Sequence, residues 1–128
     1  MKKSKKRLLK DRLDKLVKDF VKARDNKTCQ RCKKVVEGSD CHGSHVIPVS
    51  RDGRLAFDDL NIKVLCMHCH LHWWHKHPVE AGDWFKSTFP ERWEYLENEY
   101  NNNTRGGSIP IWWYEEKIEE YKNKINEI

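Results

Sequence analysis

Apolar residues recur at steps of three and four along the first part of the chain, with lysine and arginine at most other positions. The apolar positions are Leu9, Leu13, Leu16, Val17 and Phe20. This spacing predicts an amphipathic helix over residues 6–24, whose apolar stripe packs on the rest of the protein. The polar pair Asp25-Asn26 favours an end to the helix, so residues 1–25 are expected to form a first segment.

Residues 40–65 have a different pattern, in which short apolar runs are separated by glycine and proline. The two runs are Val46-Ile47 and the stretch 62–65. They predict two short strands joined by an irregular loop.

Helical spacing returns after the second of these runs. Pro78 and Pro90 favour the first positions of two helices, because a proline there lacks only an N–H that the helix does not use. The predicted helices cover residues 66–75, about 79–88 and about 90–100. Together with the strands they form a main domain over residues 26–100.

The polar stretch 101–108 contains three asparagines and two glycines and predicts a linker. A last helix is expected over residues 110–127, within a C-terminal segment 109–128. Its apolar positions are Ile111, Tyr114, Ile118, Tyr121 and Ile125. A small sheet with helices before and after it places the chain in the α+β class.

Charge is unevenly distributed along the 128 residues, whose formal net charge is +5. Residues 1–24 carry eleven Lys and Arg against three Asp, which favours a polyanionic partner such as nucleic acid. The alternative is a solvated basic helix without a partner. No apolar run approaches the roughly 18 residues of a membrane span, and no secretory signal is evident. We therefore expect a cytoplasmic protein that does not enter membranes.

Four of the five cysteines form two Cys-x-x-Cys pairs, Cys29/Cys32 and Cys66/Cys69. Thiols stay reduced in the cytosol, and two such pairs close a tetrahedral Cys₄ zinc site. Buried or redox-active thiols are the alternative. A structural Zn²⁺ is the prediction that the spacing favours. The fifth cysteine, Cys41, is expected to be a small core residue.

Between and just after the cysteine pairs come Ser44-His45, Asn61 and Cys69-His70. In this order and spacing the chain resembles the HNH endonuclease (His-Me finger) family, whose ββα-metal fold carries a histidine, an asparagine and a second histidine. More narrowly, residues 28–96 are similar to zinc-containing phage proteins of the NinG recombination type. The resemblance implies a metal-dependent DNA endonuclease, encoded by a phage or prophage and acting in DNA processing or recombination.

Carried onto this sequence, the resemblance implies that His45 is the general base and that Asn61 holds the loop behind it. His70 would bind a catalytic Mg²⁺, Mn²⁺ or similar ion. Imidazole suits a base at neutral pH because its pKa lies near 6.5. Arg51 is a candidate for a bidentate phosphate contact, and Arg54 replaces a family arginine that is absent at Ala56.

Ser44 departs from the family pattern, because many members carry a metal-binding Asp or His at that position. His75, five residues after His70, is the first candidate for the missing ligand. His42, water and the DNA phosphate are the others.

The segment after His70 is rich in aromatic residues, which fit either a core or a surface for stacking on an unpaired base. The nuclease has two rivals: a zinc-stabilised nucleic-acid-binding module without catalysis, and a protein-interaction adaptor. The oligomeric state stays open.

Overall fold

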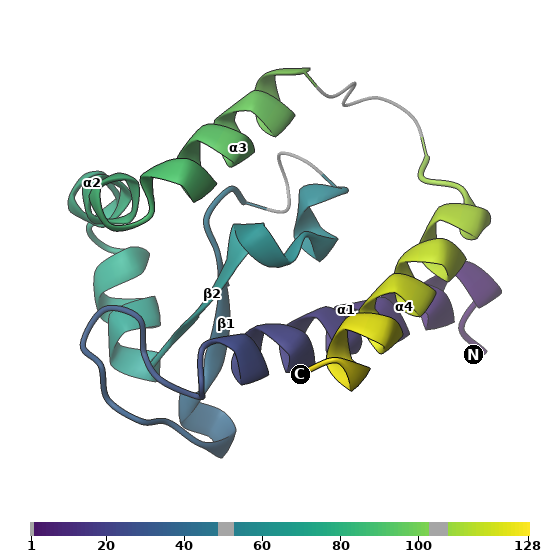
Figure 1. Cartoon of the computed structure of the whole chain (residues 1–128), viewed down its shortest axis with the longest axis horizontal. Helices are drawn as coiled ribbons and strands as arrows, with labels where there is room; N and C mark the ends of the chain where they lie inside the picture. The colour runs from purple at the N-terminus through teal and green to yellow at the C-terminus, as the bar shows by residue number, and fades with distance from the viewer. Residues whose placement is uncertain (1, 49–52, 103–107) are drawn as a thin grey trace.

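The computed structural model describes residues 2–48, 53–102 and 108–128, which form a two-stranded hairpin surrounded by helices (Figure 1). The main elements are α1 (Lys5–Arg24), β1 (His42–His45), β2 (Ile62–Leu65), the π-helical segment η4 (Cys69–Trp74), α2 (Pro78–Thr88), α3 (Pro90–Asn102) and α4 (Ile111–Asn126). The four long helices coincide with those that the sequence predicts to within two residues at each end. In the linker predicted at 101–108, residues 103–107 lie outside the described residues.

The strands pair antiparallel, with His42 opposite Leu65 and His45 opposite Ile62. The second strand is where the apolar pattern predicts it. The first is not: the strand ends at His45, before the apolar pair Val46-Ile47. The backbone N–H of Val46 instead bonds the Asn61 carbonyl at 2.8 Å, which closes the hairpin at that point. The apolar pair therefore turns into the loop.

One core lies between α1, α4 and the hairpin. On α1, Leu13, Val17 and Val21 are fully buried, at the helical spacing that the sequence shows. They pack in one cluster with Tyr114, Ile118 and Tyr121 of α4. The two helices lie side by side along the lower part of Figure 1. Cys41 belongs to the same cluster, as expected for a small core residue.

A second core lies on the other side of the hairpin, where α2 and α3 pack against the loop after β1. Its buried members are Ile47, Leu55, Phe85 and Leu96. Pro78 and Pro90 stand at the first positions of these two helices, which confirms the prediction. Several of the aromatic residues after His70 therefore serve the core, while others pack only partly against it.

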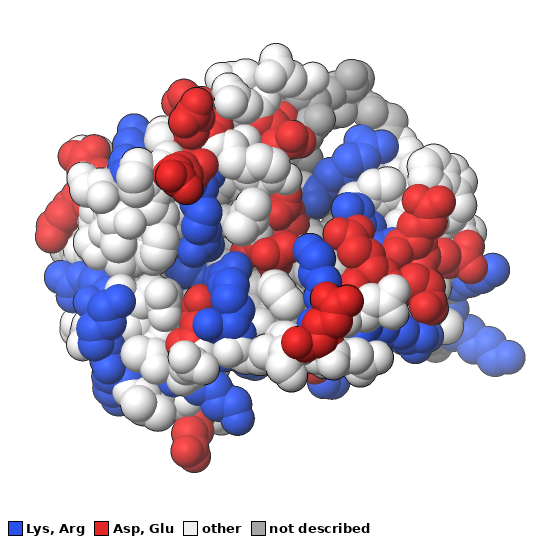
Figure 2. Space-filling view, in the orientation of Figure 1, with Lys and Arg blue, Asp and Glu red and all other residues white. Residues whose placement is uncertain are grey.

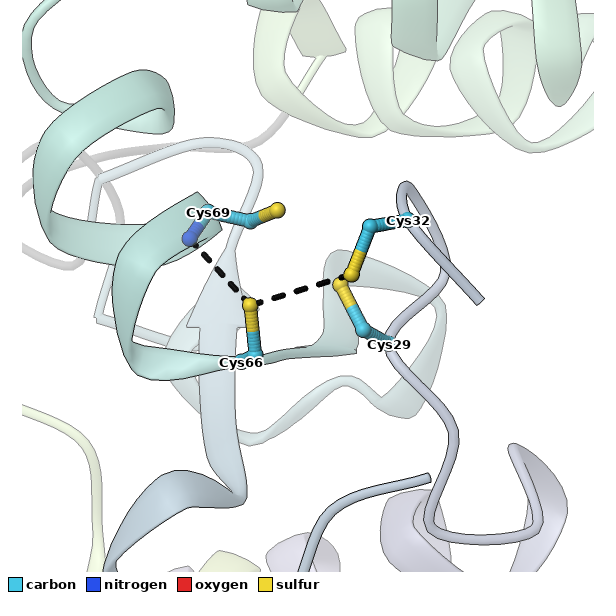
Figure 3. A group of neighbouring side chains, drawn as sticks. All are labelled: Cys29, Cys32, Cys66 and Cys69. Atoms are coloured by element: carbon cyan, nitrogen blue, oxygen red, sulfur yellow. Dashed lines mark hydrogen bonds between the residues drawn. The ribbon is translucent and has the colours of Figure 1, made fainter. Parts of the chain in front are cut away.

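The four paired cysteines converge, although 33 residues separate the two pairs in the sequence. Their sulfur atoms all lie within 4.8 Å of one another, at the start of η4 and in the loop after α1 (Figure 3). The Sγ atoms of Cys32 and Cys66 are 3.9 Å apart. Sulfurs that share a tetrahedral zinc at about 2.3 Å are separated by about 3.8 Å, so the arrangement fits that ion.

Burial of the cluster adds a chemical argument for a cation. It raises the pKa of Cys69 to about 12, so a thiolate there requires a positive partner. A zinc ion supplies that charge and deprotonates its ligands. The α+β fold with a four-cysteine zinc-type site is thus as the sequence predicts. None of the helices in the described part of the chain has the length and apolar content of a membrane span.

Replacing Leu13 by alanine removes a fully buried side chain from the contact of α1 with α4. We expect the free energy of unfolding to fall by about 2–5 kcal/mol, measured by urea denaturation. Leu8→Ala is the matched control, since Leu8 is 55% exposed, and it should change stability by less than about 0.5 kcal/mol. Equal effects of the two substitutions would show that α1 does not pack as described.

Purified protein should contain about one tightly held zinc ion per chain. Cys66→Ser removes a ligand, so zinc content and stability should both fall, as read by metal analysis and thermal unfolding. Cys41→Ser is the control and should keep its zinc. A folded wild-type protein without zinc, or a Cys66→Ser variant with full zinc content, would contradict the zinc site.

Candidate active site

His45 ends strand β1, and its ring is held by the loop that follows. Its Nε2 lies 3.1 Å from the carbonyl oxygen of Ala56. A carbonyl only accepts hydrogen bonds, so Nε2 of the neutral ring carries the proton and Nδ1 keeps its lone pair. The ring is therefore fixed in the tautomer that can take up a proton at Nδ1.

The surroundings of His45 keep it neutral. Burial lowers its pKa below the usual 6.5, and the bond to Ala56 opposes this only in part. The positive charges of Lys18 and Lys63 lower the pKa further. An imidazole in this state accepts a proton at neutral pH without first having to lose one.

Asn61 is fully buried and bonds the loop on both sides of its turn. Its Oδ1 accepts from the Ile47 N–H at 2.8 Å, and its Nδ2 donates to the carbonyls of Ile47 and Leu55, each at 3.0 Å. Leu55 directly precedes Ala56, whose carbonyl orients His45. The asparagine thus fixes the backbone on which the tautomer of His45 depends.

Side chains from three helices brace this loop and the start of β2. Arg24 of α1 and Arg92 of α3 both donate to the Ile62 carbonyl, at 2.6 and 3.1 Å. From α4, the Tyr121 hydroxyl lies 3.0 Å from the Phe57 carbonyl and accepts from the Asp59 N–H at 2.9 Å. The C-terminal helix therefore supports the loop behind His45.

The second histidine site depends on an unusual helix. The sequence predicts helix over residues 66–75, and most of this stretch is π-helical, with the His75 N–H bonded to the His70 carbonyl at 3.2 Å. In an α-helix, residues five apart point about 140° away from each other. In a π-helix they lie one above the other. The Nε2 atoms of His70 and His75 are accordingly 3.0 Å apart.

His42 lies against the opposite side of the His70 ring. Its Nδ1 is 2.9 Å from Nδ1 of His70, and its Nε2 is 2.8 Å from the Ser39 carbonyl. Because that carbonyl only accepts, the neutral form of His42 carries its proton on Nε2, and its Nδ1 accepts a hydrogen bond from the Nδ1–H of His70. Nε2 of His70 is then left with its lone pair.

This arrangement fits a divalent ion held by His70 and His75. Two nitrogens that share an ion at about 2.0–2.1 Å lie within about 4 Å of each other, as these do. Burial, together with the nearby charges of His75 and His42, lowers the pKa of His70 to about 4, so the ring is neutral and able to act as a ligand. Ligating histidines commonly bond a second group through their other nitrogen, which is the position of His42 here.

Ser44 is fully buried, and its hydroxyl bonds a side chain of the neighbouring strand. Lys63, its neighbour on β2, donates to Ser44 Oγ at 2.9 Å and lies over the Trp74 ring, 3.3 Å from the centroid. Lys63 is itself fully buried, and burial holds its pKa well below the usual range. A buried lysine thus bonds the hydroxyl group of Ser44, the position at which the family pattern often has a metal-binding Asp or His.

His45, His70 and His75 line one groove, with a volume of about 630 Å³. The sequence-predicted base and two predicted metal ligands are therefore brought to the same hollow. Arg54 is not among its lining residues; it lines a separate hollow beside Asp58 and Lys117. Arg51 lies outside the described residues.

Sequence reasoning missed the groups that prepare these histidines. The Ala56 and Ser39 carbonyls are backbone atoms and leave no signal in the side-chain pattern. In the sequence, nothing distinguishes Lys63 from any other polar residue of a short strand, so its contact with Ser44 is not predicted. Arg24 belongs to the basic arm by its place in the sequence, although it donates hydrogen bonds to the Asp59 and Ile62 carbonyls and so stabilises the fold. The five-residue spacing of His70 and His75 was the one visible sign of the π-helix.

Comparison with known proteins agrees with this geometry. The model of the HNH endonuclease family matches residues 29–73, which include both cysteine pairs, both strands, His45, Asn61 and His70. Neither the curated proteins nor the solved structures yielded a match. The order of the matched residues and the hairpin-and-helix geometry of the site assign residues 29–73 to the HNH endonuclease family.

Proposed function

We propose that the protein is a metal-dependent endonuclease that hydrolyses phosphodiester bonds in DNA. The observation that carries the proposal is the state of His45: neutral, held by Ala56 in one tautomer, and lining the same groove as His70 and His75. A histidine kept only for packing would have no need of a fixed tautomer in a groove that two further imidazoles line.

In this proposal His45 takes a proton at Nδ1 from the water that attacks phosphorus. His70 and His75 hold a divalent ion, Mg²⁺ or Mn²⁺, and His42 keeps the His70 ring in the tautomer that leaves Nε2 free. The ion supplies charge for the phosphate and for the departing 3′ oxygen. Asn61 acts through the backbone, because its bonds position Leu55 and the neighbouring carbonyl.

The basic arm lies near this site. Arg7 and Lys10 of α1 line a hollow of about 400 Å³ that also reaches His45, but Asp11 and Asp14 line the same hollow and Arg7 pairs with Asp11. Acidic side chains instead gather over α4, whereas Lys and Arg project beside the N-terminal end of α1 (Figure 2). The N-terminal end of α1 is thus the better candidate for a phosphate contact, and α4 is a poor one.

The resemblance to NinG-type proteins extends the proposal to phage DNA processing or recombination. A zinc-stabilised binding module without catalysis is the second candidate, and one observation favours it: Ser44 supplies no carboxylate to the ion. The two candidates differ in a direct way, since only the nuclease cuts the DNA that it binds.

His45→Ala should lower the rate of plasmid nicking by about 10²–10⁴, because the general base is lost while the zinc site is untouched. His70→Ala should weaken binding of the catalytic ion, so that high Mn²⁺ restores part of the rate. His42→Ala should have a smaller effect of the same kind, since it acts through His70. Nicking rates over a range of Mn²⁺ concentrations measure all three.

The control is His68→Ala, which removes an exposed histidine outside the groove and should leave the rate unchanged. Zinc content should match that of the wild type in every variant. Nicking by His45→Ala at the wild-type rate would mean that another group is the base.

The pH dependence follows from the lowered pKa of His45. The base works only when deprotonated, so at saturating metal the rate should rise with pH and reach half its maximum below pH 6.5. Above that it should be level. A rate that still rises about tenfold per pH unit between pH 7 and 9 would assign the titration to another group.

A further inference from the structure

The groove beside the catalytic histidines has aromatic walls that the proposed mechanism does not use. Together with His45 and His70, the groove is lined by Trp74, Phe85 and Trp93. Trp74 and Trp93 are each half-buried, so part of each ring faces the hollow. Lys18 and Lys86 line the same groove, which gives it positive charge.

The aromatic lining continues beyond this groove. A second hollow of about 420 Å³ shares Val46, Pro48 and Trp93 with the first and extends to Tyr100. Trp93 therefore lies where the two hollows meet. Together they form an aromatic track, which we define by Trp74, Trp93 and Tyr100, and which leads away from the site of hydrolysis.

The chemistry of this track fits a nucleobase rather than a phosphate. A base presents a flat π-face to an aromatic ring, and such stacking strengthens single-strand binding about 5- to 100-fold per base. Lys86 lies over one face of the Trp93 ring, with its Nζ 4.7 Å from the ring centroid, and adds a positive charge at this point of the track. Inside a duplex both faces of a base are covered by its neighbours, so only an unpaired base can lie against the ring.

We propose that the aromatic track binds an unpaired nucleotide next to the scissile phosphate, so that the preferred substrate is DNA with unpaired bases at the cleavage point. This proposal rests on the proposed function, because it takes the strand to pass His45. The proposed function does not say whether the DNA substrate is a fully paired duplex or carries unpaired bases, and the aromatic track favours unpaired bases.

The test compares a duplex oligonucleotide with the same duplex carrying a short unpaired bulge, for wild type and Trp93→Ala. Wild type should bind and cleave the bulged DNA at least about tenfold better than the duplex. Trp93→Ala should lower the affinity for the bulged DNA by about 5- to 100-fold and change the affinity for the duplex little. Trp93→Tyr should retain most of the preference, and Trp112→Ala, which removes a 57% exposed tryptophan on α4, should be neutral.

A change in the DNA keeps the proposal testable if Trp93→Ala folds poorly. An abasic nucleotide in place of an unpaired base should weaken wild-type binding by a similar factor. For Trp93→Ala, the abasic site should lower the binding affinity little further, because the ring on which the base stacks is already absent. Binding is measured without added divalent ion, which leaves the zinc site intact, and cleavage with Mn²⁺.

The outcomes separate the two proposals. Equal binding of duplex and bulged DNA by wild type, or no effect of the abasic site, overturns the aromatic track. Preferential binding of bulged DNA without cleavage of any substrate retains the track and overturns the nuclease. Tight binding of an apolar peptide in place of bulged DNA would assign the track to a protein partner.

Discussion

The site depends on the convergence of four thiols that are far apart in the sequence. Cys29 and Cys32 lie in the loop after α1. Cys66 directly follows β2, and Cys69 is the first residue of η4. Holding these sulfurs within 4.8 Å fixes where η4 begins, and His70 is the residue directly after Cys69. In a chain with small cores, a zinc ion shared by these thiols would determine the position of η4 relative to the strand that carries His45.

A second constraint lies within η4 itself. The π-helical geometry brings His70 and His75 together, which an α-helix over the same residues would not do. Carbonyl groups then select the protonation of the rings: Ser39 acts on His42 and, through it, on His70, and Ala56 acts on His45. The nitrogens that keep a lone pair are thus defined by hydrogen bonds to the backbone, so their arrangement depends on the loops that hold those carbonyls.

The sequence predicts most of the fold because helix periodicity, proline positions and paired cysteines each have a direct structural cause. It placed the long helices, β2 and the four-cysteine cluster well. The apolar pattern misplaces β1, because Val46 and Ile47 pack in the second core and do not belong to the strand. Lys63 could not be foreseen beside Ser44, because cross-strand register is set by the hairpin and leaves no periodic signal. The roles given to the site residues remain predictions.

The central claim is that these histidines form a working catalytic site. Its most direct test is the nicking of supercoiled plasmid by zinc-loaded wild-type protein, with and without added Mg²⁺ or Mn²⁺. Open-circular product is expected only when the ion is added. A preparation of the His45→Ala variant, purified in the same way, should not give it. DNA binding without nicking across Mg²⁺, Mn²⁺, Co²⁺ and Ni²⁺ would contradict the claim and leave a zinc-stabilised binding module.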